Sequence, residues 1–311
     1  MIPQVSVPTQ GLPLRLFLGD VIRTCRPGQW AKNVFVLAPL LFSQKITDVW
    51  AVMAAGTAFA CFCLWSSAVY FWNDVLDAAA DRQHPRKCNR PIAAGRISSG
   101  FAVFLGFFLA VEAGLIAVSF LPAVVLLFGL LYLANSVGYC LLLKHRVIAD
   151  VMSIAVGFVL RLMAGCATIG VQPTSWLLVC GFSLALLLGF GKRRLEIAAL
   201  AEPGKYRPTL DYYSVDKLNV LLGTASSICL LTYMLYTVSP QTVALHNTDK
   251  LIYTVPFVAY GVFRYLFKVQ EGLYDGPVEI LLKDRIFLIN GLLWLVAIVV
   301  ILYLGNHLAF S

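Results

Sequence analysis

Nine apolar runs, separated by short polar segments, constrain this chain more than any other feature of its sequence. A helix needs about 20 apolar residues to cross the hydrocarbon core of a bilayer, and most of the runs reach that length. The pattern predicts an all-α, polytopic membrane protein with nine transmembrane helices. The runs lie near residues 34–46, 49–72, 99–119, 121–143, 147–170, 174–191, 215–238, 250–268 and 286–308.

The composition supports the same class. Only 13% of the 311 residues are charged and 59% are hydrophobic, with a mean hydropathy of +0.80. A soluble domain carries about 25% charged residues. We therefore expect a single integral membrane domain over residues 1–311. It would comprise a cytoplasmic arm (1–29), with an interfacial helix near residues 14–22, and a helical bundle (30–308).

The basic residues predict the orientation. All 24 of them, except Lys45, Arg161 and Lys250, lie in the N-terminal arm or in and beside the connections after the second, fourth, sixth and eighth runs. Short cytoplasmic loops collect Lys and Arg, so this side is predicted to be cytoplasmic, with the C-terminus outside the plasma (inner) membrane. The net charge of +8 then reflects topology, and no nucleic-acid partner is expected.

A cluster of acidic residues ends the second apolar run, in "YFWNDVLDAAADRQHPRKCNRPIAAG" (70–95). On a helix Asn73, Asp77 and Asp81 share one face, and Asp74 adjoins it. Clustered carboxylates repel one another, which favours a bound cation. Hard oxygen ligands suit Mg²⁺, so we predict a catalytic metal site in which Asn73, Asp77 and Asp81 are ligands and Asp74 assists. The alternative is a solvated acidic helix end that binds no ligand.

Five basic residues follow directly, between residues 82 and 96. Lys and Arg bind phosphate oxygens, and Arg can do so in a bidentate manner. Carboxylates followed by such a loop predict a site for Mg²⁺ and a diphosphate. The residues of this loop that we expect to contact the substrate are Arg82, Lys87 and Arg90.

The segment resembles a known family. "NDVLDAAAD" matches the NDxxDxxxD motif of the UbiA superfamily of intramembrane prenyltransferases, and "DRQHPRKCNRPIAAG" is similar to the continuation common in that superfamily. The resemblance extends over about residues 20–305. It implies an all-helical bundle of nine spans with a polar cavity that opens to the cytoplasm.

Three further stretches resemble one branch, the decaprenyl-phosphate phosphoribosyltransferases: "RPGQWAKN" (26–33), "YCLLLKHRVIADVMSIAVGFVLRLMAG" (139–165) and "LLLGFGKRRLEIAAL" (186–200). The resemblance implies transfer of 5-phosphoribosyl from phosphoribosyl pyrophosphate (PRPP) to a long-chain polyprenyl phosphate, with release of pyrophosphate, in the synthesis of an arabinose donor for the cell envelope. Some relatives associate, so a homo-oligomer is a further expectation.

The chain departs from the usual prenyltransferase pattern after the sixth run. A second Asp-rich motif, D-x-x-x-D, is typical there, whereas this chain has Lys192, Arg193, Arg194 and Glu196. PRPP carries a 5-phosphate that a prenyl diphosphate lacks, so a second, basic region fits PRPP. We expect Lys192, Arg193 and Glu196 to contribute to substrate binding. The alternative is that these charges only flank the membrane.

The fourth and fifth runs contribute four more candidate substrate contacts: Tyr139, Lys144, Asp150 and Arg161. An unpaired Arg in mid-membrane costs at least about 2.5–3.5 kcal/mol and usually faces a cavity or a partner. Arg161 therefore either contacts the active-site cavity or pairs with a carboxylate such as Glu112.

Two basic residues precede the first run, in "RPGQWAKN". Arg26 and Lys32 either serve as topology charges or contact a substrate phosphate, as the resemblance implies.

Two other functions stay open at this stage. A conventional prenyltransferase would place a prenyl diphosphate on the same carboxylates and transfer the chain to an aromatic acid or glycerol phosphate. An anion transporter, the more distant alternative, would be expected to present polar groups on both faces, whereas the polar segments here gather on one.

Overall fold

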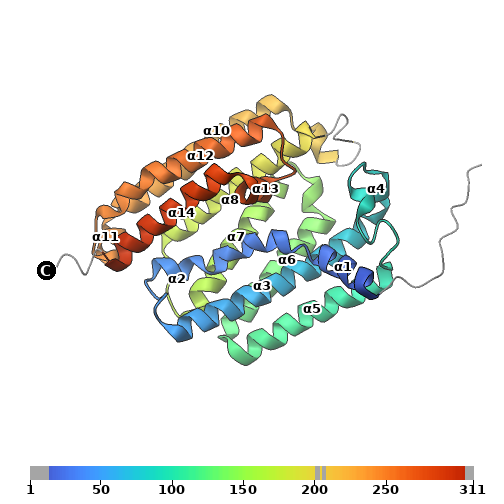
Figure 1. Ribbon diagram of the computed structural model, residues 1–311, viewed down its shortest axis with the longest axis horizontal. Coiled ribbons are helices and arrows are strands. Elements are labelled where there is room, and N and C mark those ends of the chain that lie inside the picture. The colour runs from blue at the N-terminus through green and yellow to red at the C-terminus, as the bar shows by residue number, and fades with distance from the viewer. Residues whose placement is uncertain (1–13, 200–203, 205–207, 305–311) are drawn as a thin grey trace, which may run out of the picture.

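A computed structural model describes residues 14–199, 204 and 208–304 (Figure 1). This part of the chain is helical and contains no β-strand. The predicted residues 1–13 of the N-terminal arm, and the end of the ninth run beyond residue 304, lie outside the described residues. In chain order the elements are α1 (Leu14–Cys25), η1 (Pro27–Val36), α2 (Ala38–Phe42), α3 (Val49–Leu76), α4 (Ala78–Gln83), η2 (Lys87–Asn89), α5 (Ser99–Phe120), α6 (Ala123–Leu141), η3 (Leu143–His145), α7 (Ala149–Thr168), α8 (Ser175–Ala198), η4 (Pro208–Asp211), α10 (Val215–Val238), α11 (Pro240–His246), η5 (Lys250–Thr254), α12 (Val255–Glu271), α13 (Pro277–Lys283), α14 (Arg285–Val299) and η6 (Val300–Leu304).

The all-α, membrane-spanning character is confirmed. Within the described residues, seven helices are long and apolar enough to cross a bilayer: α3, α5, α6, α7, α8, α10 and α14 with η6. The predicted count of nine stays a prediction, because the other two runs fold into shorter pieces. The run at 34–46 consists of part of η1 and the five-residue α2, and the run at 250–268 consists of η5 and the 17-residue α12.

The first apolar run is not a regular long helix because its backbone lies against α7. Residues 27–36 form a 3₁₀ segment, and Pro39 stands in the first turn of α2. At Gly165 of α7 an added Cβ would meet the Val36 carbonyl oxygen at 2.2 Å. Small residues allow this close approach between helices in a membrane. As a result the segment that carries Lys32 and Asn33 lies against α7.

The long helices begin where the sequence supplies N-cap side chains. Asp48, Ser98, Thr174 and Ser214 accept hydrogen bonds from first-turn amides of α3, α5, α8 and α10, and Asp284 does so for α14. Such caps satisfy amides that would otherwise lack a partner, and each stabilises its helix by about 1 kcal/mol.

The helices alternate in direction, so the connections gather at two ends of the bundle. Figure 1 shows α1 and α4 toward one end and α2 and α11 toward the other. α10 and α12 form one flank, α3 and α5 the opposite flank, and α7 and α8 lie between them. We call the end that carries α4, η2, η3 and the connection after α8 the motif end, because it holds most of the predicted site residues.

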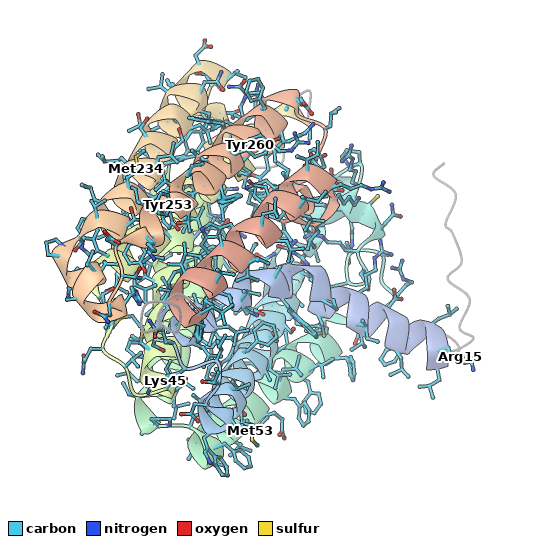
Figure 2. The ribbon with its side chains drawn as sticks, turned by 60° about the vertical axis from the view of Figure 1, so that its left-hand side comes forward. Arg15, Lys45, Met53, Met234, Tyr253 and Tyr260 are labelled. Atoms are coloured by element: carbon cyan, nitrogen blue, oxygen red, sulfur yellow. The ribbon has the colours of Figure 1, made fainter. Side chains whose placement is uncertain are left out.

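α1 projects from the motif end of the bundle, and Figure 2 shows Arg15 near its far end. The helix is anchored by Arg96, which donates to both carboxylate oxygens of Asp20 at 2.7 and 3.1 Å. Leu14, Leu16 and Ile22 are largely exposed. The helix predicted at residues 14–22 is present, and its place in the membrane interface stays a prediction.

Candidate active site

The carboxylate cluster (Asn73, Asp74, Asp77 and Asp81) spans the junction of α3 and α4. Asp77 lies between the two helices, and the backbone bonds from Asp77 N to Asn73 O and from Asp81 N to Asp77 O, 2.9 and 2.8 Å long, continue the helical register. The predicted i, i+4, i+8 spacing is therefore present. Asn73 Nδ2 donates to Asp77 Oδ2 at 3.1 Å.

Basic side chains from three distant segments neutralise this cluster. Arg90 Nη1 donates to Asp74 Oδ1 at 3.1 Å and to Asp81 Oδ2 at 2.6 Å. Arg26 also pairs with Asp74 and lies over the ring of Tyr70. Lys144 Nζ donates to Asp77 Oδ1 at 2.6 Å. Asp74 and Asp81 therefore share Arg90, whereas Asp77 pairs with a different cation.

The loop between α4 and α5 is folded so that Arg90 reaches these carboxylates. His84 Nδ1 accepts hydrogen bonds from the Arg86 and Lys87 amides, at 3.2 and 3.3 Å. Arg82 Nε donates to the Ala93 carbonyl at 3.1 Å. Gly95 has φ +75°, a conformation that glycine adopts without strain. The role of His84 here is structural, through its acceptor nitrogen.

The donor set of the carboxylate cluster fits Mg²⁺. One nitrogen of Arg90 lies within hydrogen-bonding distance of both Asp74 and Asp81, so two buried carboxylates converge on a single positive atom. Among the described residues no group of three or more His, Cys, Asp or Glu side chains is close enough to form a metal site by itself. Mg²⁺ commonly takes one or two carboxylates and completes its shell with water and phosphate oxygens.

A second group, the Arg193 cluster (Tyr139, Asp150, Arg193, Glu196 and Tyr213), joins α6, α7 and α8. Arg193 Nε donates to Asp150 Oδ2 at 2.6 Å, Nη1 to Glu196 Oε2 at 2.5 Å and Nη2 to the Tyr139 hydroxyl at 3.0 Å. The side chains of Arg193 and Asp150 are 0% exposed. A buried charge needs this kind of full compensation, so the pair fixes the relative position of α7 and α8.

Lys192 lies at the rim of the Arg193 cluster. Its side chain is 36% exposed, and Nζ is 3.9 Å from Glu196 Oε1. The positive charges of Lys192 and Lys32 repel each other and that of Arg193.

Lys87 connects the two clusters electrostatically. Burial, and then the neighbouring Arg90 charge, lower the pKa of Lys87, while the carboxylates of Asp81 and Glu196 oppose this shift. The charge of Lys87 therefore interacts with one carboxylate of each cluster.

Arg161 lies deeper in α7 and is 6% exposed. Its guanidinium donates to Asn33 Oδ1 at 2.8 Å, to the Gly157 carbonyl at 2.8 Å and to the Tyr132 hydroxyl at 3.1 Å. These hydrogen bonds go to neutral groups and not to Glu112. The ring of Tyr132, 4.4 Å from the guanidinium carbon, adds a cation–π contact.

Three residues outside the predicted set take part in these networks: Asn33, Tyr132 and Tyr213. Tyr213 donates to Asp150 Oδ1 at 3.1 Å and accepts from the Ile148 amide at 2.8 Å. Burial raises the pKa of Tyr213 to about 12, so the hydroxyl keeps its proton and can donate. The only sequence feature that could have identified Asn33 is its place at the end of the stretch "RPGQWAKN". No sequence pattern marks Tyr132 or Tyr213 as part of the site.

Tyr213 also supports a strained turn. Ile148 has φ +66°, which is unusual for a β-branched residue and costs on the order of 1–3 kcal/mol. In the preceding residues Thr209 Oγ1 donates to the Lys144 carbonyl at 3.1 Å. The segment at 209–213 therefore holds the turn that carries Lys144 to the carboxylate cluster and Asp150 to Arg193.

The fold and the carboxylate cluster together define a class of helical membrane proteins with charged groups at one end of the bundle. The UbiA prenyltransferase family matches over residues 33–273, and the chain belongs to this family. A UbiA homolog from Archaeoglobus fulgidus, solved with GPP and Mg²⁺, has a TM-score of 0.68 at 16% identity, over 90% of this chain and 96% of that one.

The narrower resemblance is also confirmed. The chain is 34% identical to the decaprenyl-phosphate phosphoribosyltransferase of Corynebacterium glutamicum over 94% of this chain and 89% of the relative. It is likewise 34% identical to the enzyme of that name from Mycolicibacterium smegmatis, over 93% of each chain. The corresponding Mycobacterium tuberculosis protein is 30% identical over 92% of this chain and 95% of the relative.

Proposed function

We propose that this protein transfers 5-phosphoribosyl from PRPP to a long-chain polyprenyl phosphate and releases pyrophosphate. The observation that carries the proposal is the Arg193 cluster with Lys192, which occupies the position where a conventional prenyltransferase has its second acidic motif. The relatives named decaprenyl-phosphate phosphoribosyltransferase, each matched over nearly their whole length, support the same substrates.

The carboxylate cluster is proposed to bind the pyrophosphate end of PRPP. Asn73, Asp77 and Asp81, with Asp74 assisting, would hold Mg²⁺, which neutralises negative charge on a departing pyrophosphate when it is bound. Arg90, which pairs with Asp81, and Lys87, whose charge Asp81 attracts, can then donate to phosphate oxygens.

The region at the rim of the Arg193 cluster is proposed to bind the 5-phosphate end. Lys192 is the partly exposed cation of this region, and it interacts electrostatically with Lys32 of η1. Arg193 is enclosed, so we assign it a positioning role in which it orients Glu196 and the Tyr139 hydroxyl. The other proposed contacts are Arg26, Arg82, Lys144 and Arg161, whereas Asp150, which is enclosed with Arg193, is assigned a positioning role.

The reaction breaks the bond between ribose C1 and the pyrophosphate oxygen and forms a bond from C1 to an oxygen of the lipid phosphate. Positive charge develops at C1 as pyrophosphate leaves, and the cations around the carboxylate cluster stabilise the departing negative charge. The lipid phosphate is already an anion at neutral pH, so its attack needs no general base. The structural role of His84 agrees with this account.

The remaining expectations belong to the same proposal. The motif end would face the cytoplasm, where PRPP is soluble, the lipid acceptor would arrive from the bilayer, and the C-terminus would lie outside. Association into a homo-oligomer also stays a prediction.

A transfer assay tests the function. Purified protein in nanodiscs, with Mg²⁺, polyprenyl phosphate and PRPP labelled in the ribose, should move the label into the lipid extract. The comparison reaction supplies a prenyl diphosphate with an aromatic acid or glycerol phosphate. Prenyl transfer without ribosyl transfer would overturn the proposal in favour of a conventional prenyltransferase.

A further inference from the structure

α1 covers the segment between α4 and α5, which we call the motif loop (residues 84–98). Phe17, Val21 and Cys25 recur every four residues, so they share one face of α1. These three side chains pack against the hydrophobic cluster that contains Ile92 of the motif loop, which is 2% exposed. The motif loop is therefore held in part by a helix that precedes it by more than 50 residues in the sequence.

Arg96 adds a charged contact between α1 and the motif loop. Its guanidinium donates to both carboxylate oxygens of Asp20, at 2.7 and 3.1 Å, and Nη2 also donates to the Asn89 carbonyl at 3.0 Å. The side chain of Asp20 is 13% exposed. Two charge-assisted hydrogen bonds from one guanidinium are strong and fix its orientation. Because Asn89 directly precedes Arg90, Arg96 links α1 to the peptide group beside Arg90.

The main chain around Arg90 forms a tight turn that is attached on two sides. The Ala94 amide donates to the Arg90 carbonyl at 2.8 Å. Arg82 of α4 donates to the Ala93 carbonyl at 3.1 Å, which ties the turn to α4. Arg96 ties the same turn to α1, so loss of its carboxylate partner would remove the charged connection on that side.

The other cation beside Asp74 also depends on α1. Arg26 directly follows α1 and pairs with Asp74, the carboxylate that Arg90 reaches at 3.1 Å. The end of α1 is attached to α3, because Ser67 donates to the Cys25 carbonyl at 3.2 Å. A helix attached both to α3 and to the motif loop can set the spacing of the two cations around Asp74.

We propose that Asp20 and Arg96 are positioning residues for the transfer reaction: their ion pair clamps the motif loop to α1 and so holds Arg90 where it donates to the pyrophosphate. The proposal rests on the proposed function, in which Arg90 is a pyrophosphate contact. Asp20 acts only through Arg96 and the turn, and touches no substrate. A displacement of about 1 Å in a group that positions a reacting substrate can cost about 100-fold in rate, so a remote ion pair can control the reaction.

Hydrogen–deuterium exchange of the protein in nanodiscs, without substrate, tests the clamp. Asp20→Asn should speed exchange in peptides from the motif loop at least about threefold, because the turn opens more often. Asp20→Glu keeps a carboxylate and should stay close to the wild type. The matched control is Asp249→Asn, the same chemical change at an exposed residue between α11 and η5. Equal exchange in the Asp20→Asn and Asp249→Asn variants would overturn the proposal.

Kinetics test whether the clamp acts through Arg90. Asp20→Asn should lower kcat/KM for PRPP about tenfold and leave the KM for polyprenyl phosphate within about twofold. In an Arg90→Met background the same substitution should change kcat/KM by less than about twofold, since the side chain to be positioned is already gone. Arg90→Lys serves as the background if the Met variant is too slow to assay. A tenfold loss that persists in either background would mean that Asp20 does not act through Arg90, and would overturn the proposal.

The two measurements separate this inference from the proposed function. Protein whose motif loop loosens in Asp20→Asn, but whose wild type transfers no ribose, would sink the proposed reaction and leave the clamp standing. Protein that transfers ribose equally well with Asp20→Asn and with Asp249→Asn would overturn the positioning role and leave the reaction standing.

Discussion

The two charged clusters at the motif end contain similar groups in opposite surroundings. In the carboxylate cluster the basic partners are partly exposed: the side chain of Arg26 is 25% exposed, that of Arg90 24% and that of Lys144 14%. In the Arg193 cluster the central pair, Arg193 and Asp150, is completely enclosed.

The difference separates binding from positioning. The partly exposed cations of the carboxylate cluster can turn toward an anionic ligand, and a bound metal ion can take their place beside the buried carboxylates of Asp74 and Asp81. The members of a buried ion pair cannot give each other up for a ligand, because either one alone would be a buried charge without a partner. The carboxylate cluster is therefore suited to bind substrate and metal, whereas the Arg193 cluster is suited to fix the helices around it.

The largest effect is expected in the carboxylate cluster. Asp81→Asn should lower kcat by about 10³-fold or more, since it removes a proposed metal ligand and one of the two carboxylate partners of Arg90. The control is Asp275→Asn, the same chemical change at an exposed ion pair with Arg86. An Asp81 variant as active as the Asp275 variant would contradict the assignment of the cluster.

The next largest effect should appear as a loss of stability in the Arg193 cluster. Arg193→Met leaves the Asp150 carboxylate buried without its cation and should cost about 3–5 kcal/mol of unfolding free energy. Unfolding in detergent, followed by circular dichroism, measures it. The double variant Asp150→Leu/Arg193→Met removes both charges and should be more stable than the single one. An additive or larger loss in the double variant would show that the pair does not act as a unit.

At the rim of the same cluster, Lys192→Met should act on binding. Loss of one charged hydrogen bond to phosphate is worth about 1.5–3 kcal/mol, so the KM for PRPP should rise roughly 10- to 100-fold with a smaller change in kcat. Arg194→Met is the control, because Arg194 donates to Asn219 on α10 at 3.4 Å. Equal KM values for the two variants would remove Lys192 from the 5-phosphate site.

The smallest effect is expected at Tyr213. Tyr213→Phe removes the hydrogen bonds to Asp150 and from the Ile148 amide and should cost about 1–3 kcal/mol of unfolding free energy. Because the strained turn at Ile148 loses support, kcat should fall a few-fold while the KM for PRPP stays constant. Tyr212→Phe, at a 67% exposed neighbour, should change neither quantity. A Tyr213 variant with wild-type stability would mean that the turn holds without it.

Much of the fold follows from the length of the apolar runs. The runs at 99–119 and 215–238, for example, match α5 and α10 within a residue at each end, because Ser98 and Ser214 are ordinary N-caps. The run at 34–46 does not become one long helix, because it begins in a 3₁₀ segment that packs against Gly165 of α7. Hydropathy reports how apolar a segment is, not how closely its backbone approaches a neighbour.

The site was predictable to the extent that its residues are local in sequence. The spacing of Asn73, Asp77 and Asp81 is a property of one helix and could be inferred directly. The hydrogen-bond partners of Arg161 could not, because Asn33 and Tyr132 lie on other elements and carry no charge that marks them.

The sequence by itself determined the membrane class, the helical register of the carboxylate motif and the family, because each depends on composition or on spacing along one segment. Tertiary structure decided which cations neutralise which carboxylates: Arg90 bridges Asp74 and Asp81, Lys144 takes Asp77, and Arg193 is enclosed with Asp150. The physical reason is that the energy of a charge depends on its distance from its neighbours and on its exposure to water, and only the packing of distant helices fixes both.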